Sequence, residues 1–581
     1  MGSYVSYAMF TVTEEKNNAI SIVTGNLYYD LKVDGAASNT LTVPANSFKE
    51  FIITLTNTNN RTTRLNLYYV GNVSDEVDVA YIEEGYNSIP AAAGENFANG
   101  ASKQYKIRVS NTSSSSVTVN LGVEAGLDYN DLSIPSDGHE IRKITIRGLV
   151  TDVVKDDIMN RLNTSDSEQT FVTGENPNNY IWYSGKLWRV VSVDPSDNSV
   201  KLVTQWNISS IPYNTADHSA FRNSHMETWL NDTSVDGFLG NLRDVDTFIK
   251  TNSQWNATQT TATTKPPKTT MITKTVGLLN VYEYTMSYSG TTAEAGYLNN
   301  NLYWWTLTPN SATQITAIDA VGGLDISITN IGRGIRPAIN LKPSVTIVGG
   351  SGTEDDPFRL AGDNDSNLSG TLLSNRYSGE YVSFGSGENN LYRIISHENG
   401  LNKLVAAKPL TENGTYITKR FHTSAGNVIF SPNTSAYELA YYLNHVYLDT
   451  SQGFMTDDQK ALIEVNTWYL GTVGTGDSYR LAKYTTATGS TLTSTTTASK
   501  AGTLRMGELF AGQTAHSTDT VQYWLLTPHN TSYVRRINTT SYSDQAATNN
   551  ARGVVPVISL NSNVKIVGGD GTKNNPFQIS A

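Results

Sequence analysis

The chain has 581 residues, a formal net charge of −11, no cysteine and only 16% charged residues. Its acidic balance and its lack of Lys/Arg runs exclude nucleic acid as a partner, because phosphate binding needs clustered cations. Without cysteine there is no disulfide and no thiolate–metal site, and no apolar stretch is long enough to span a membrane.

Residues 4–135 predict a β-sandwich. Apolar and polar residues alternate from Ser47 to Thr56, and the pattern resumes from Leu65 to Val70 after a turn rich in Asn and Thr. It recurs from Tyr105 to Val109 and from Val117 to Val123. Period-two alternation broken by Asn, Ser and Gly turns is typical of sandwich folds.

A charged connector is expected at 136–170. Asp152 to Leu162 places Val154, Ile158 and Leu162 at helical spacing, which predicts one short helix.

The end of the chain occurs twice. Residues 333–358 read RGIRPAINLKPSVTIVGGSGTEDDPF, and residues 552–577 read RGVVPVISLNSNVKIVGGDGTKNNPF in a gapless register. Two copies of one α+β module are therefore expected, repeat 1 over 171–360 and repeat 2 over 371–581, joined by a solvated linker at 361–370. The predicted fold class is mainly β, with an N-terminal β-sandwich followed by two tandem homologous domains.

Within the repeats, helical spacing predicts short helices at His225 to Asn231 and at Ala436 to Val446. Thr-rich stretches at 257–275 and 485–498 predict long exposed loops or hairpins. The Gly-Gly-x-Gly-Thr segments of both copies lack the Lys-Ser/Thr of a phosphate-binding loop, and they predict structural β-turns.

No catalytic constellation is present. The sequence contains neither a G-x-S-x-G elbow nor an H-E-x-x-H pair, and its eight histidines are scattered. The prediction is a protein that is not an enzyme, with no catalytic residue, metal or cofactor.

Seven residues are candidates for ligand binding: three tryptophans, and two glutamates and two arginines that occupy matching places in the copies. Tryptophan rings stack on sugars, paired acids can hydrogen-bond a ligand, and arginines beside glycine can clamp a carboxylate. The candidates are Trp304, Trp305, Trp524, Glu283, Glu508, Arg333 and Arg552. For each, packing or bracing within the fold is the alternative.

The repeats resemble an uncharacterised domain family of Gram-positive, gut-type surface proteins. The motifs that carry the resemblance are Trp188-Arg189-Val190, Trp229-Leu230-Asn231, Glu283-Tyr284, Trp304 to Pro309 and Gly334-Ile335-Arg336-Pro337-Ala338. The second copy departs from this pattern at Tyr392, Tyr442 and Val555. The layout is similar to C-type-lectin-like domains, and this similarity implies a fold and not a function.

The N-terminal segment resembles the camelysin/TasA-type fibre proteins of Gram-positive biofilms. The resemblance rests on SYAMFT at 6–11, VPANS at 43–47 and LTNTN at 55–59. It implies that residues 4–12 could be donated as a strand to a neighbouring subunit, with Tyr4, Tyr7, Met9 and Phe10 as the donated side chains.

Two functions follow as expectations. The first is an adhesin on the bacterial surface, with tandem lectin-like modules that bind a carbohydrate or a host or bacterial surface protein. The second is a subunit of an extracellular filament or pilus, a homopolymer assembled through the N-terminal strand. Both imply an extracellular location. Met1-Gly2-Ser3 is typical of a cloning remnant, so a native signal or anchor segment is expected to have been removed.

Overall fold

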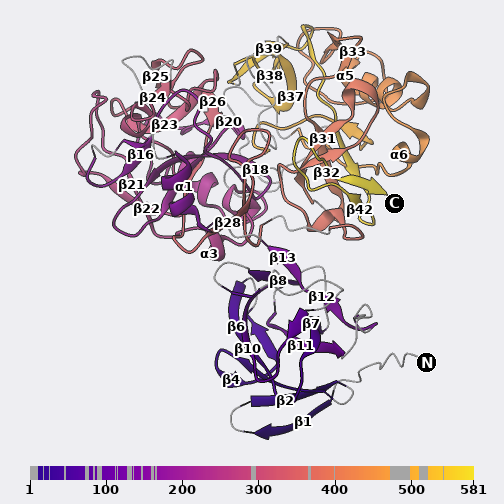
Figure 1. The fold of residues 1–581 in the computed structure, drawn as a ribbon. Coiled ribbons are helices and arrows are strands. Elements are labelled where there is room, and N and C mark those ends of the chain that lie inside the picture. Colours follow the sequence, from indigo (N-terminus) through magenta and orange to yellow (C-terminus); the bar gives the residue numbers. More distant parts are fainter. Residues whose placement is uncertain are drawn as a thin grey trace. The chain divides into compact units, whose positions relative to one another are not determined.

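The structure is a computed structural model that describes residues 11–16, 19–24, 27–44, 47–71, 77–82, 86–87, 95–111, 113, 115–126, 134, 136–144, 148–158, 162–163, 166–288, 296–363, 368–397, 400–470, 498–508, 521–540 and 542–580. Strands far outnumber helices (Figure 1), which confirms the prediction of a mainly β chain. The chain divides into two compact units. Unit 1 is Met1–Gly148 with Thr346–Gly349, and unit 2 is Leu149–Val345 with Gly350–Ala581.

Unit 1 contains two sheets. The first has the order β1-β2-β3-β6-β10-β8-β13, with β4 beside β3, and the second has the order β12-β7-β11-β5, with β9 beside β7. The strands of the first sheet are β1 (Thr11–Lys16), β2 (Ala19–Thr24), β3 (Leu27–Val33), β4 (Ala36–Ala37), β6 (Ser47–Asn57), β8 (Val77–Ile82), β10 (Ser102–Asn111) and β13 (Arg142–Ile144). Those of the second are β5 (Thr40–Val43), β7 (Thr63–Val70), β9 (Glu95–Phe97), β11 (Val117–Gly126) and β12 (His139–Glu140).

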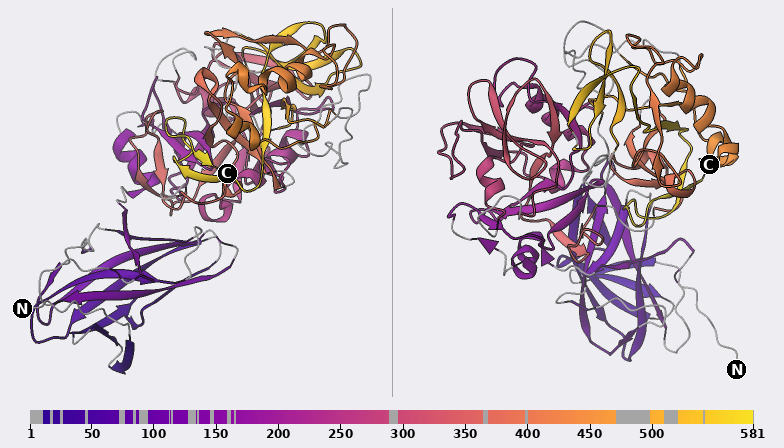
Figure 2. Two further views of the ribbon diagram at one scale, coloured as in Figure 1. Left: turned by 90° about the vertical axis from the view of Figure 1, so that its right-hand side faces the viewer. Right: turned by 90° about the horizontal axis from the view of Figure 1, so that it is seen from above.

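Alternating side chains from both sheets of unit 1 enter one hydrophobic core. Leu31, Ile53 and Ile107 come from the first sheet, and Leu65 and Val119 from the second, all fully buried. The period-two pattern read from the sequence therefore marks the core-facing side of each strand. The indigo and violet strands in Figure 2 belong to these sheets.

Unit 2 has two halves with matching strand orders. The first half is residues 149–345 and 350–360, and the second is residues 371–580. One sheet runs β17-β18-β19-β27 in the first half and β30-β31-β32-β41 in the second. The other runs β20-β26-β23-β24-β25 in the first half and β35-β40-β37-β38-β39 in the second. Even the irregular registers correspond, at Trp305/Pro309 and Trp524/Pro528.

The elements of the first half are α1 (Val150–Ile158), β15 (Leu162–Asn163), β16 (Thr170–Val172), β17 (Tyr180–Tyr183), β18 (Lys186–Val193), β19 (Val200–Thr204), β20 (Ser209–Pro212), α2 (His225–Asn231), α3 (Val245–Phe248), β21 (Ser253–Asn256), β22 (Met271–Lys274), α4 (Val281–Thr285), β23 (Trp304–Pro309), β24 (Gln314–Ile318), β25 (Leu324–Ile328), β26 (Gly332–Ile335), β27 (Ala338–Leu341) and β29 (Phe358–Leu360). β28 (Thr346–Gly349) belongs to unit 1.

The elements of the second half are β30 (Tyr381–Ser383), β31 (Leu391–Ser396), β32 (Asn402–Ala406), β33 (Thr411–Glu412), β34 (Thr415–Tyr416), β35 (Thr418–Arg420), α5 (Glu438–Tyr442), the π-helical turn Leu443–Tyr447, α6 (Asp457–Ala461), β36 (Ala501–Gly502), β37 (Tyr523–Pro528), β38 (Tyr533–Ile537), β39 (Ser543–Ala547), β40 (Ala551–Gly553), β41 (Val557–Leu560), β42 (Lys565–Gly568) and β43 (Gln578–Ser580).

The predicted helices lie close to where the sequence placed them. The helix expected over Asp152 to Leu162 is α1, which begins at Val150, and Leu162 instead pairs with Val172 in a short ladder. α2 covers His225–Asn231 as expected. The Thr-rich stretch at 257–275 is largely the connection of the β21–β22 hairpin, whereas 485–497 lies outside the described residues.

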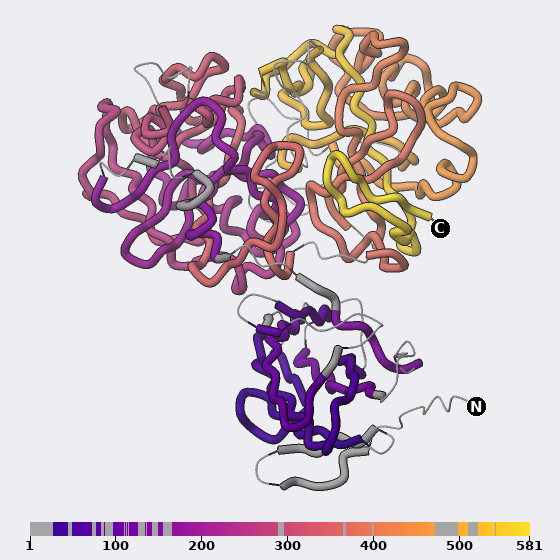
Figure 3. Tube along the Cα trace, viewed as in Figure 1, coloured from indigo at the N-terminus to yellow at the C-terminus, as the bar shows by residue number. Residues whose placement is uncertain are grey.

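The end of each half returns to its beginning. In the first half β29 pairs with β17, and the Tyr180 amide donates to the Gly352 carbonyl at 2.9 Å. In the second half the Tyr381 amide donates to the Gly571 carbonyl at 2.8 Å, and Phe577 bridges to Val382. Figure 3 shows the yellow C-terminal segment beside the orange start of the same half. The glycine-rich turns are thereby held beside β17 and β30.

Within the described ranges, no helix is both long and apolar enough to cross a membrane.

Candidate ligand-binding site

The three candidate tryptophans lie in the interior of unit 2. Trp304, Trp305 and Trp524 are each at most 1% exposed. The Trp305 indole donates to the Ile211 carbonyl at 3.0 Å, and the Trp524 indole donates to the Lys419 carbonyl at 2.8 Å. Their rings pack inside the halves, and none presents an open face for stacking on a ligand.

The two candidate glutamates each form a buried ion pair. Glu283 pairs with Lys201, and Glu508 pairs with Lys403, at corresponding places in the halves. Each ammonium also lies over an indole ring, Trp255 for Lys201 and Trp468 for Lys403. The carboxylates therefore have partners inside the protein. The second oxygen of Glu283 accepts from the amide of Asn280, the N-cap of α4, and that of Glu508 accepts from the Arg505 amide.

The two candidate arginines have different surroundings. Arg333 makes an ion pair with Asp325 at 3.0 Å and stacks on Tyr303 and Tyr542. Arg552 donates to the Ala551 carbonyl at 2.7 Å, and burial lowers the pKa of its guanidinium. The structure does not bring the seven candidates together around one opening.

The proposed donor residues Tyr4, Tyr7, Met9 and Phe10 lie outside the described residues. The segment expected to be a solvated linker contains Asp363, which is only 5% exposed. The Ser184 amide donates to its carboxylate at 3.1 Å, and burial raises its pKa to about 6.

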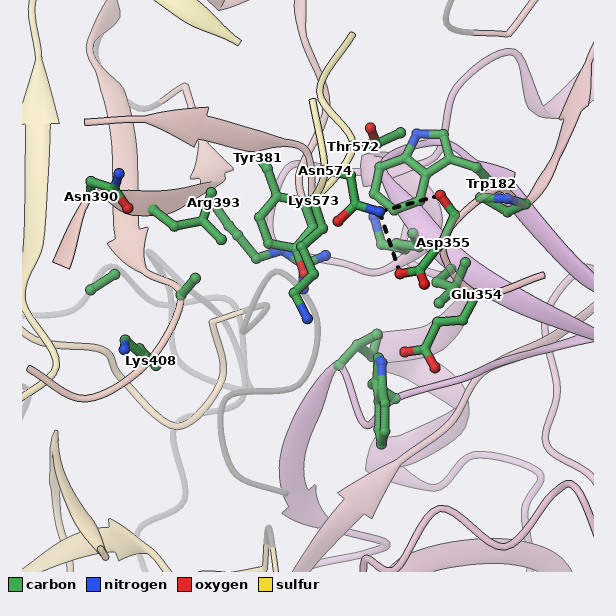
Figure 4. Close-up of a pocket in the computed structure, with 18 of the residues that line it drawn as sticks. Trp182, Glu354, Asp355, Tyr381, Asn390, Arg393, Lys408, Thr572, Lys573 and Asn574 are labelled. Atoms are coloured by element: carbon green, nitrogen blue, oxygen red, sulfur yellow. Dashed lines mark hydrogen bonds between the residues drawn. The ribbon is translucent and has the colours of Figure 1, made fainter. Parts of the chain in front are cut away.

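A cavity of about 530 Å³ lies between the two halves of unit 2 (Figure 4). Cavities of this size are typical of small-ligand sites. The first half contributes residues from β17, β18, the segment after β19, and the turn at 350–357. The second half contributes the corresponding parts: β30, β31, the segment after β32, and the turn at 569–576. None of the seven sequence-predicted ligand residues is in this lining.

Aromatic rings form part of the cavity wall. Trp182 stacks with Tyr381 across the two halves, with ring centroids 6.4 Å apart and an angle of 27° between the rings. Trp206, partly exposed, follows β19 and also lines the cavity. Aromatic faces combine a large apolar area with little conformational freedom, which suits the recognition of flat or ring-shaped ligands.

The two glycine-rich turns meet at the cavity. The Asn574 side-chain amide donates to the carbonyl and to the carboxylate of Asp355, both at 3.3 Å. The turns need glycine, since Gly350 and Gly569 have φ values of +83°. A Cβ atom at these positions would lie 2.0 and 2.1 Å from the carbonyl oxygens of Pro357 and Pro576. The glycines thus hold the lining side chains in place.

Charge is distributed unequally over the two turns. Glu354 of the first turn corresponds to Lys573 of the second, and both line the cavity. Figure 4 shows Glu354 and Asp355 on the side of Trp182, with Arg393 and Lys408 on the opposite side.

Arg393 is a buried cation in the cavity wall. It is 4% exposed, and its Nε donates to the Gly379 carbonyl at 2.8 Å. Its guanidinium lies 4.3 Å from the centre of the Tyr381 ring. Burial lowers its pKa. The guanidinium thus braces the ring that stacks on Trp182.

Sequence reasoning missed this site because it assigned the glycine-rich turns a purely structural role. The turns are structural, but the residues that follow their last glycine face a cavity. One signal was available: Glu354 and Lys573 carry opposite charges within an otherwise similar repeated segment. A change of charge between a kept Gly-Thr and a kept Pro-Phe indicates positions that do not serve the shared fold.

The lining suits binding. It offers aromatic faces, amides from Asn389, Asn390 and Asn574, and side chains of both charges, and the lining residues that the structure describes include no histidine or serine. Within the described part of the chain, no group of three or more His, Asp or Glu side chains is placed to hold a metal ion.

Comparison with known proteins gives one family. Residues 198–343, which lie in the first half of unit 2, match a family described as a domain of unknown function (DUF6273). No curated protein and no solved structure matches the chain.

Proposed function

We propose that the protein is a non-catalytic binding protein of the bacterial cell surface that recognises a saccharide in the cavity between the halves of unit 2. In this proposal unit 1 is a TasA/camelysin-type β-sandwich, and the halves of unit 2 are two tandem C-type-lectin-like modules. Their matching strand orders support a duplicated module. The saccharide would be part of a carbohydrate on a host or bacterial surface.

The composition of the cavity carries this proposal. Trp206 and the stacked pair of Trp182 and Tyr381 provide apolar ring faces. Asn390, an exposed residue of the wall, provides an amide that can donate to and accept from hydroxyl groups. Sugars present both an apolar C–H face and a rim of hydroxyls, so they match both features of the wall.

A glycan array probed with the whole chain and two variants tests the proposal. Trp206→Ala removes a partly exposed ring of the cavity, and Tyr533→Ala removes an exposed ring of β38 that does not line it. We expect the wild type and Tyr533→Ala to bind the same glycans, and Trp206→Ala to lose them at an unchanged melting temperature. Binding to no glycan, or equal binding by all three proteins, would overturn the proposal.

One observation favours a filament subunit as a second candidate. Among the described strands, β5 ends its sheet and pairs only with β11, while Leu41 and Val43 alternate into the core. Such an edge can accept a strand from another chain. Electron microscopy of the protein with and without residues 4–12 tests this candidate. Filaments that disappear on deletion would support it, and discrete particles in both samples would contradict it.

A further inference from the structure

We infer that the saccharide held in this cavity carries a negatively charged group, a carboxylate, sulfate or phosphate, which binds against the wall of the second half. This inference rests on the proposed function and names the class of ligand. The cavity wall contains charges of both signs, and these charges differ in whether they already have partners inside the protein.

Two lysines of the wall have no partner. Lys408 follows β32 and Lys573 lies in the second glycine-rich turn, and both side chains are exposed. Neither makes an ion pair or a hydrogen bond with any residue that the structure describes. Their ammonium groups are therefore available to a ligand.

Arg393 adds a third positive charge to the same wall. Its side-chain hydrogen bonds to backbone go to the carbonyls of Gly379 and Gly185. Carbonyl oxygens orient a guanidinium but do not neutralise it. A buried cation without a counter-ion is costly, and an anionic ligand beside it would reduce that cost.

The carboxylates of the wall are each engaged. Glu354 accepts a hydrogen bond from the Tyr180 hydroxyl, which adds to burial in raising the pKa of that tyrosine. Asp355 accepts from Asn574 at 3.3 Å. Glu388 accepts from the Gly414 amide at 3.3 and 3.4 Å. These neutral donors leave the carboxylates charged, so the balance of each wall decides the sign. The second-half wall has three cations, Arg393, Lys408 and Lys573, against Glu388, whereas the first-half wall has Lys186 against Glu354 and Asp355.

The net charge of the whole chain bears on where a preference for anions can come from. At −11 the protein repels anions at long range, so a preference for an acidic sugar must arise from cations at the site. The corresponding wall of the first half has Trp206 in place of Lys408 and Glu354 in place of Lys573. The anionic group is therefore expected on the second-half side, and the sugar ring on the Trp206 side.

Isothermal titration of the whole chain with three disaccharides tests this assignment. The probes are digalacturonic acid, a sulfated digalactose and neutral digalactose. We expect each acidic probe to bind at least about tenfold more tightly than the neutral one at low salt, and the ratio to fall as sodium chloride is raised. Comparing the two acidic probes separates a site for carboxylates from one for sulfates.

Variants assign the preference to the two lysines. Lys408→Gln/Lys573→Gln should bring the acidic and neutral affinities within about twofold of each other, with neutral binding kept. Lys565→Gln, which removes an exposed lysine of β42 outside the cavity, should leave both affinities unchanged.

Equal affinity of the wild type for acidic and neutral probes would overturn the inference and leave the proposed function standing. Binding of no saccharide at all would overturn the proposed function itself. An equal effect of Lys565→Gln would show a general charge effect and also overturn the inference.

Discussion

Asn574 and Asp355, which lie 219 positions apart at the same place in the two repeated segments, are hydrogen-bonded to each other. A contact between corresponding positions places the two glycine-rich turns side by side. The turn that closes each half onto β17 or β30 therefore also joins the two halves. In this way one repeated segment serves the fold of each half and the wall of the shared cavity.

The contact between the turns predicts the effect of a charge change. Asn574→Asp would replace the amide donor with a second carboxylate facing Asp355. Both side chains are exposed, so the expected loss of stability is below about 1 kcal/mol, and it should shrink in high salt because exposed charges are screened. Thermal unfolding at low and high salt measures this, with Asn563→Asp as the matched control in an exposed turn. A loss that does not depend on salt would contradict the electrostatic cause.

The buried ion pairs predict a large effect on stability. Glu508→Ala would leave the Lys403 ammonium buried without its counter-ion, which typically costs about 3–5 kcal/mol. Replacing both partners, as Lys403→Met/Glu508→Leu, should restore most of that loss. Glu464→Ala removes an exposed carboxylate nearby and should change stability by less than about 0.5 kcal/mol. Urea denaturation of the four proteins is the measurement, and a cost for Glu508→Ala as small as that of the control would count against the pair.

Asp363 predicts a dependence of stability on pH. Its folded pKa is raised to about 6, chiefly by burial, while the pKa of an Asp side chain in the unfolded chain is near 3.8. The folded state therefore favours the protonated acid. The stability that this group contributes is fully present below pH 3.8 and is lost as the pH rises through 6, in total by about 3 kcal/mol at 1.36 kcal/mol per pKa unit.

The measurement compares Asp363→Asn with the wild type at pH 4 and pH 7. Because the amide does not titrate, the melting temperature of the variant relative to the wild type should rise from pH 4 to pH 7. Asp217→Asn, at an exposed position, should show no such trend. A constant difference for Asp363→Asn would mean that the carboxyl is not destabilised by burial.

Sequence reasoning reached the parts of this fold that depend on local pattern. Alternation identified the strands of unit 1 because the sheets have one core face, and α2 was found by helical spacing. The matching ends of the repeats indicated a duplicated module, and the halves have matching strand orders. These features are encoded within a few residues of each other along the chain.

The cavity depends on how distant segments pack, and local pattern does not report that. Trp304 and Trp182 are both large rings in strands, and nothing in their immediate sequence shows that only the second lines an opening. In the structure Trp304 is buried and packs against Tyr284 of its own half, whereas Trp182 meets Tyr381 of the other half. Matching residues between copies indicated shared packing, while the site uses positions at which the copies differ, such as Glu354 and Lys573.

The glycine-rich turns predict a difference between two substitutions of the same kind. Gly569 and Gly453 have similar φ values, +83° and +79°, so alanine at either position is strained by about 1–2 kcal/mol. At Gly569 the added Cβ would also lie 2.1 Å from the Pro576 carbonyl oxygen, whereas at Gly453 nothing lies within 4 Å. Gly569→Ala should therefore destabilise the protein clearly more than Gly453→Ala, and it should also weaken saccharide binding because the turn carries Lys573 and Asn574. Chemical denaturation and titration with the same glycan check both effects. Equal losses from the two substitutions would mean that the turn moves without cost, and the turn would then not position the cavity wall.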